Sequence, residues 1–129
     1  MGKAFREADG AASGSGSSAA QPATDDLLAS GKAPDKNNYT RAGHELKKHA
    51  NRATNTGQWP RPTGKQNPWS WNDLGEDTLT KIIEDPKVAV QQYSNRAGDN
   101  ILEYHVPWGG VQFRQPGGVG DWVLHSFRD

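Results

Sequence analysis

The stretch Asn100–Arg114 reads NILEYHVPWGGVQFR and shows most clearly how the chain folds. Apolar and polar residues alternate over 100–106, which is the period of a half-buried β-strand. The segment 107–110, Pro-Trp-Gly-Gly, consists mainly of turn-forming residues, and the alternation resumes at Val111. Two alternating runs joined by a short turn predict an antiparallel pair of strands.

The same alternation predicts which side chains of these strands face away from the core. Leu102, Tyr104 and Val106 suit the core face, so Glu103 and His105 point together to the other face. We therefore expect a polar surface made of these side chains: Glu103, His105, Gln112, Arg114 and either His125 or Ser126.

Two helices are expected before the strands. The first covers residues 39–51, where apolar positions recur at helical spacing. The second begins at Asn72 or Asp73, which can cap it, and Pro86 stops it. The residues between these helices, 54–71, are expected to form a long loop.

Residues 87–93 and 121–127 predict two further strands beside the alternating pair. Pro- and Gly-rich connections indicate that sequential strands are antiparallel. Helices followed by an antiparallel meander predict an α+β fold. In this fold N-terminal helices pack on a twisted antiparallel sheet of about four strands.

The amino-acid composition predicts two regions in the chain. Residues 1–36 are rich in Ala, Ser, Gly and Asp, and they bury too little apolar surface to offset their ordering entropy. We expect a flexible linker over 1–36, with one helical turn at 25–30, and a folded domain over 37–129. The chain has no cysteine, so disulfides and thiolate chemistry are excluded. No apolar run approaches the length of a membrane span, so no membrane anchoring is expected here.

Charge is unevenly distributed, although the net charge is zero. Residues 41–68 contain six Lys or Arg and one Glu, whereas residues 69–103 contain three Lys or Arg and seven Asp or Glu. A polyanion can dock on the first stretch. Within it, Lys48-His49 and the nearby Arg52 combine a side chain that carries protons near neutral pH with side chains that hold phosphate.

Such a combination suits RNA cleavage without a metal ion. The reaction needs a base for the ribose 2′-OH, an acid for the departing 5′-oxygen and a cation for the phosphate. The proton-transfer candidates are His49 and, as its partner, His125, Glu103 or His105. The candidate phosphate clamps are Lys48, Arg52 and Arg114. The products would be a 2′,3′-cyclic phosphate and a 5′-hydroxyl.

Each of these residues also has a purely structural interpretation. His49 at a helix C-terminus suits the helix dipole, and Trp59 is either a core anchor or a platform for a base. The residues alone therefore leave three hypotheses. Beside the ribonuclease stand a metal-dependent endonuclease, with Asp99, Glu103 and His105 as ligands, and a non-catalytic module that binds RNA or protein.

A series of short motifs, each present once, spans about two-thirds of the chain. In order, they are Gly43, Lys48-His49, Arg52, Trp59-Pro60, Gly64, Asn72, Gly75, Leu79, Ile82-Ile83, Pro86, Gly98-Asp99, Gly110–Arg114 and Gly120-Asp121-Trp122. This set resembles the C-terminal toxin domains of bacterial polymorphic and contact-dependent inhibition toxins. More narrowly, it resembles the ribonuclease toxins grouped with barnase, EndoU, colicin D and RelE as the BECR fold.

The resemblance implies a metal-independent endoribonuclease, without a cofactor, that cleaves tRNA or other RNA in interbacterial competition. It implies a monomer with a cognate immunity protein, delivered as part of a larger secreted or cell-surface toxin and acting in the target-cell cytoplasm. The implied catalytic residues are Lys48, His49 and Arg114, with His125 or Ser126 near the last strand. The residues expected to contact the RNA are Lys47, Arg52, Trp59, Glu103 and His105.

Overall fold

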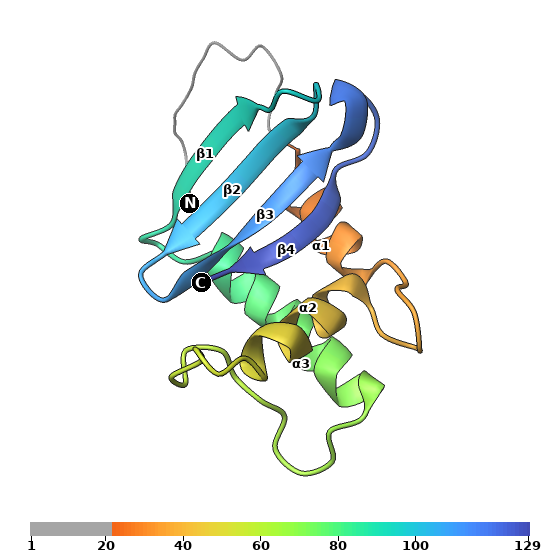
Figure 1. Cartoon of the computed structure of the whole chain (residues 1–129), viewed down its shortest axis with the longest axis vertical. Helices are drawn as coiled ribbons and strands as arrows, with labels where there is room; N and C mark the ends of the chain where they lie inside the picture. The colour runs from red at the N-terminus through yellow and green to blue at the C-terminus, as the bar shows by residue number, and fades with distance from the viewer. Residues whose placement is uncertain (1–21) are drawn as a thin grey trace.

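The computed structural model describes residues 22–129 as three helices followed by one sheet (Figure 1). The helices are α1 (Thr24–Lys32), α2 (Arg41–Ala50) and α3 (Pro68–Ile83). The strands are β1 (Ala89–Ser94), β2 (Asn100–Val106), β3 (Gly109–Gln115) and β4 (Val123–Arg128), with a short 3-10 helix, η2 (Pro116–Gly118), before β4. The strands form an antiparallel sheet in the order β1-β2-β3-β4, so the α+β fold class is confirmed.

The two faces of the sheet have different surroundings. On the inner face, Leu102 lies opposite Phe113, Tyr104 lies opposite Val111, and all four side chains are buried. Helix α3 contacts β2 and β3, while α1 and α2 contact β4, so the helices cover this inner face. In Figure 1 the strands lie in front of α3, and no helix of the described residues crosses their near face. We call this uncovered side the open face.

Helices α2 and α3 approach each other closely because small residues lie where they cross. A Cβ added to Gly75 would lie 2.5 Å from the carbonyl oxygen of Ala42, and one added to Gly43 would collide with Asn72. Asn72, on α3, also accepts a hydrogen bond from the backbone N–H of Thr40 at 2.7 Å. The start of α2 is therefore fixed in place by α3.

One correction concerns the C-terminal part of the expected linker, which the structure folds into a helix. Residues 24–32 form α1 instead of a single helical turn, and α1 packs against α2, α3 and β4. Leu27 of this helix is fully buried in the core, which stabilises it against the entropy cost of ordering. Residues 1–21 lie outside the described residues, and the division of the chain into linker and domain stays a prediction.

A second correction concerns the start of α3, which lies at Pro68 and not at Asn72 or Asp73. Asn67 caps this helix by accepting a hydrogen bond from the backbone N–H of Ser70 at 2.9 Å, and proline suits the first helical position. The expected loop over 54–71 is therefore shorter at its C-terminal end. The remaining elements begin and end within two residues of their expected bounds. No helix in the described part of the chain is long and apolar enough to cross a bilayer.

Candidate active site on the open face of the sheet

A carboxylate is the centre of the polar contacts on the open face. The Glu103 carboxylate accepts hydrogen bonds from the Tyr93 hydroxyl at 2.9 Å and from Nε2 of Gln112 at 2.5 Å. Its other oxygen, Oε1, lies 3.0 Å from Nε2 of His105. The Nε of Arg114 donates to Oε1 of Gln112 at 2.9 Å. These five side chains, which we call the Glu103 network, join three adjacent strands.

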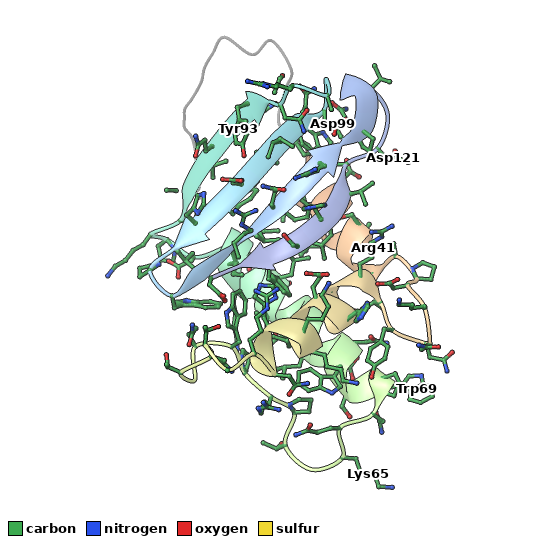
Figure 2. All side chains as sticks on the ribbon, in the orientation of Figure 1. Arg41, Lys65, Trp69, Tyr93, Asp99 and Asp121 are labelled. Atoms are coloured by element: carbon green, nitrogen blue, oxygen red, sulfur yellow. The ribbon has the colours of Figure 1, made fainter. Side chains whose placement is uncertain are left out.

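The strand register explains why the side chains of the Glu103 network contact one another. Glu103 lies opposite Gln112 of β3, and Arg114 and His105 are two residues away on their own strands, where side chains return to the same face. Tyr93 of β1 lies opposite Ile101, the next residue of β2 on that face. Figure 2 shows the Tyr93 side chain over the upper part of the sheet. The predicted polar surface is therefore present.

Glu103 as a whole residue is only 8% exposed, yet its carboxylate remains the charged partner in the network. Burial alone would raise its pKa, but hydrogen bonds from Gln112, Tyr93 and His105 outweigh this and lower the pKa. Burial and the bond to Glu103 raise the pKa of Tyr93, which keeps the phenol as a proton donor. An ionised Glu103 forms an ion pair with His105 when that ring is protonated.

His105 is the exposed member of this pair. The side chain of His105 is 47% exposed, against 10% for that of Glu103. A substrate on the open face can therefore touch the histidine ring, while Glu103 holds the ring from below. A buried carboxylate that orients an exposed histidine is a recurring arrangement in proton-transfer sites.

Strand β4 contributes two of the expected site residues. Ser126 lies opposite Gln112, so it borders the Glu103 network. The pairing then shifts, because Phe113 lies opposite Leu124, and His125 is the extra residue of a β-bulge. His125 is exposed. Partial desolvation of its ring by neighbouring side chains and the positive charge of Arg114 lower the pKa of His125, which favours its neutral form.

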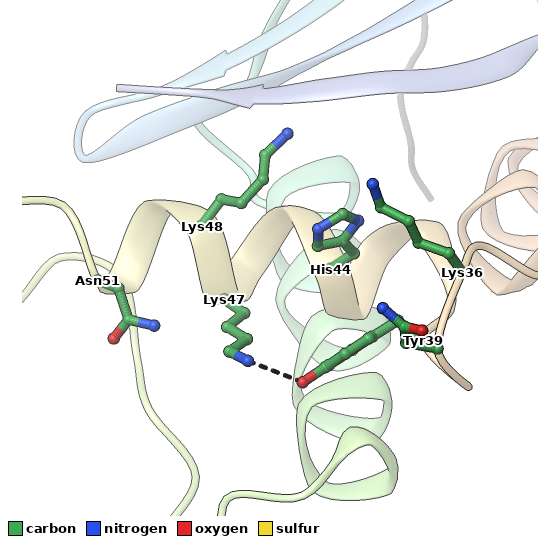
Figure 3. A pocket seen from close by; sticks show the side chains of 7 residues that line it. Lys36, Tyr39, His44, Lys47, Lys48 and Asn51 are labelled. Atoms are coloured by element: carbon green, nitrogen blue, oxygen red, sulfur yellow. Dashed lines mark hydrogen bonds between the residues drawn. The ribbon is translucent and has the colours of Figure 1, made fainter.

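Helix α2 borders this face at the β4 edge. Nη1 of Arg41 donates to the carbonyl oxygen of Leu124 at 3.4 Å, which ties the helix to the strand. The Nζ of Lys48 lies 2.8 Å from Oε2 of Glu45, and Figure 3 shows Lys48 extending from α2 toward the sheet. The expected position of Lys48 beside the polar surface agrees with this geometry.

His49 lies on the other side of the sheet from the Glu103 network. It is 2% exposed, and its ring packs 5.0 Å from Trp59 and 6.2 Å from Phe127, measured between ring centroids. Its Nδ1 lies 3.1 Å from the carbonyl oxygen of Glu45, and its Nε2 lies 3.2 Å from Nη1 of Arg52. Burial lowers the pKa of His49. This geometry favours a structural role for His49 over the expected contact with substrate.

Two residues expected to contact RNA surround His49. Trp59 is 1% exposed, and its Nε1 donates to Oδ1 of Asp129 at 2.7 Å, so its ring is a core anchor. Arg52 is exposed and lies 3.5 Å from the other carboxylate oxygen of Asp129. Trp59 therefore offers no face to a base, whereas Arg52 remains accessible to a phosphate.

The sequence-based interpretation missed Tyr93 as a site residue and treated Gln112 only as an outward-facing position. The available signal for Tyr93 was its weakly alternating strand, which does not give the register against β2.

The residues of the alternative metal site are not brought together either. Asp99 accepts hydrogen bonds from the backbone N–H of Gly117 and from Asn95. No three His, Cys, Asp or Glu side chains of residues 22–129 are grouped as metal ligands.

Comparison with known proteins connects this geometry to a family. The CdiA C-terminal tRNase toxin domain matches residues 28–117, which is more than half of the chain. The chain belongs to this family. The solved structure of the toxic C-terminal tip of CdiA from Pseudomonas aeruginosa, in complex with an immune protein, is 25% identical, with a TM-score of 0.54. The match covers 78% of this chain and 98% of that chain. No curated protein matches.

Family membership establishes the class of activity. The chain is an RNA-cleaving toxin domain of the tRNase type, used in contact-dependent inhibition. The toxin family and the enzyme class expected from the sequence are therefore confirmed, and the non-catalytic module does not hold. The narrower BECR grouping stays a prediction.

Proposed function

We propose that the open face of the sheet is the catalytic centre and that it cleaves tRNA without a metal ion. The Glu103 network carries this proposal, because it places a histidine, a carboxylate and an arginine on a face that no described helix covers. These are the groups that RNA cleavage needs for proton transfer and for holding the phosphate.

The two histidines of this face have environments that suit opposite roles. His105, whose exposed ring lies 3.0 Å from the Glu103 carboxylate, acts as the acid. Partial desolvation and the charge of Arg114 lower the pKa of His125, and its neutral ring acts as the base. Arg114, on β3 between the strands of the two histidines, holds the phosphate.

The proposed reaction balances without any added reactant. His125 takes the proton of the ribose 2′-OH, and the 2′-oxygen forms a bond to phosphorus. The bond from phosphorus to the 5′-oxygen breaks, and His105 gives its proton to that oxygen. The products are a 2′,3′-cyclic phosphate and a 5′-hydroxyl, and exchange with water restores both histidines. Lys48 and Ser126, at the border of the face, bind the RNA backbone beside the reacting phosphate.

A partner also follows from the comparison. The similar CdiA tip is bound to an immune protein. We infer that this chain, a monomer in the toxin, has its own cognate immunity protein, which covers the open face before delivery into the target cell. The toxin domain acts in the cytoplasm of the target cell, where tRNA is present.

The proposal is tested with purified protein, total bacterial tRNA and excess EDTA. We expect discrete fragments with cyclic-phosphate ends from the wild type and none from Arg114→Ala. Fragments that form only after Mg²⁺ is added, or that carry 5′-phosphate ends, would contradict the metal-free reaction. Lys81→Ala, on the exposed side of α3, controls for effects of a substitution that are unrelated to the open face.

A further inference from the structure

A surface hollow of about 360 Å³ lies along α2, and none of the side chains of the Glu103 network lines it. Figure 3 shows the side chains that surround it, from the loop before α2 and from one side of the helix. The lining residues used below are Lys36, Asn37, Tyr39, His44, Lys47 and Lys48. We call it the α2 hollow.

The α2 hollow carries positive charge that is only partly neutralised. Asp35 pairs with His44 at 2.8 Å, and Glu45 pairs with Lys48. Within residues 22–129, neither Lys36 nor Lys47 forms an ion pair. The hollow therefore presents two ammonium groups to a ligand that brings negative charge.

An aromatic platform lies beside these lysines. The rings of Tyr39 and His44 stack with centroids 5.7 Å apart and an interplanar angle of 30°. The Nζ of Lys47 donates to the Tyr39 hydroxyl at 2.9 Å and lies 5.1 Å from the centre of that ring. Stacked rings next to lysines are the combination that binds a nucleobase together with its phosphate.

The backbone under the platform is strained and held from below. Asn37 and Asn38 both have positive φ, 59° and 68°, which is uncommon for residues other than glycine. The buried side chain of Asn72 donates from Nδ2 to the carbonyl oxygen of Asn38 at 2.9 Å, and its Oδ1 accepts from the N–H of Thr40. Strain that the surrounding structure maintains in this way is typical of binding sites.

We propose that the α2 hollow is a second RNA-binding site, in which Lys36 and Lys47 hold backbone phosphate and Tyr39 stacks on an unpaired base. The site rests on the proposed function, because it binds the same tRNA at a distance from the cleaved bond. Lys48 lines the hollow and also extends toward the sheet, so one strand of RNA can pass from the open face to the hollow. Lysines beside a stacked pair of rings fit RNA better than they fit the acidic surface of a protein, which needs no stacking platform.

The test measures binding separately from cleavage. The probe is a fluorescent, tRNA-length RNA hairpin in which every ribose carries a 2′-O-methyl group, so that no 2′-OH is available for attack. The double variant Lys36→Glu with Lys47→Glu is compared with Lys81→Glu with Lys87→Glu, which changes the charge equally at two exposed lysines outside residues 41–68.

We expect the hollow variant to weaken binding about tenfold or more, and to lower the slope of log Kd against log salt by about one to two, since each lost phosphate contact removes roughly 0.7–0.9. The control pair should change Kd less than about threefold, as exposed charges are screened. Tyr39→Leu should weaken binding severalfold, and Tyr39→Phe, which keeps the ring, should not. If the reversed charges impair folding, Lys36→Gln with Lys47→Gln gives the same comparison.

Equal losses in both double variants would overturn the proposal. Unchanged binding in the hollow variant would also overturn it, and would indicate that the hollow binds a protein partner such as the immunity protein.

Cleavage is then measured in EDTA on tRNA and on a short oligoribonucleotide. The hollow variant should raise KM for tRNA and cleave the short substrate as the wild type does. Failure of the wild type to cleave would count against the proposed function alone, because the probe reports binding without cleavage.

Discussion

Each side of the sheet carries a histidine with a polar partner, but the two histidines have opposite access to water. On the helix-covered side, His49 contacts Arg52 and packs between Trp59 and Phe127 at 2% exposure. On the open face, the His105 side chain is about half exposed and contacts Glu103. The comparison shows that a histidine beside cations is not enough to identify a proton carrier. Exposure and a charged partner decide which histidine can reach a substrate.

Apart from removal of the two open-face histidines, the largest expected effect is on the open face, at Arg114. Arg114→Ala should lower the cleavage rate by about 10²–10³-fold, because a fixed cation at the phosphate is worth this much in the transition state. The melting temperature should change little, since only the Nε of Arg114 is hydrogen-bonded within the described residues. Arg96→Ala, at an exposed arginine before β2, is the matched control and should leave the rate unchanged. A parallel loss of rate and stability would make Arg114 structural.

On the helix-covered side, a substitution should lower stability rather than the cleavage rate. His49→Ala should lower the free energy of unfolding by about 2–4 kcal/mol, as expected for truncating a buried ring. His105→Ala, at an exposed ring, should lower it by less than about 1 kcal/mol. Urea unfolding of both variants measures the difference. A fully stable but inactive His49→Ala protein would restore His49 as a catalytic residue.

A smaller effect should follow at the edge of the Glu103 network. Tyr93→Phe removes one of the hydrogen bonds to the Glu103 carboxylate. The cleavage rate should fall by roughly twofold to tenfold, the usual value of one such bond. The pKa of Glu103 should also rise, since the Tyr93 bond lowers it. Steady-state rates and NMR titration of Glu103 measure both effects, and unchanged values would show that Tyr93 lies outside the site.

The smallest expected effect is a pH dependence on the helix-covered side. Burial lowers the pKa of His49, so below about pH 6.5 the unfolded chain binds a proton that the folded chain does not. The free energy of unfolding should therefore fall as the pH decreases from 7.5 to 5.5. His49→Gln should show a weaker decrease over this range. His125, whose pKa is also lowered, remains in both proteins and cancels in the comparison. Identical pH profiles would contradict the burial argument.

Local patterns predicted the open face because a strand repeats every two residues. The alternation of β2 placed Glu103 and His105 together, and the turn chemistry after Val106 placed β3 beside it. Tyr93 was missed because its position depends on the register of β1, which a weak alternation does not specify.

The helix-covered side was harder to predict because distant residues determine it. His49 is buried by Trp59, which comes from the loop after α2, and by Phe127 near the chain end. Nothing in the sequence around Lys48-His49 reports these contacts. The burial of Leu27, which makes α1 part of the fold, depends in the same way on elements far along the chain. The start of α3, in contrast, was available in the sequence as a capping Asn67 followed by Pro68.

The most direct test of the account is the rate of tRNA cleavage in EDTA by three single variants, expressed per folded molecule. His105→Gln and His125→Gln should each lose about 10²–10⁴-fold in rate, as expected for removal of a proton-transfer group. His49→Gln should stay within about threefold of the wild type, a barrier change below about 1 kcal/mol. Loss of activity in folded His49→Gln, with activity retained in His105→Gln, would place the catalytic centre on the other side of the sheet and contradict the account.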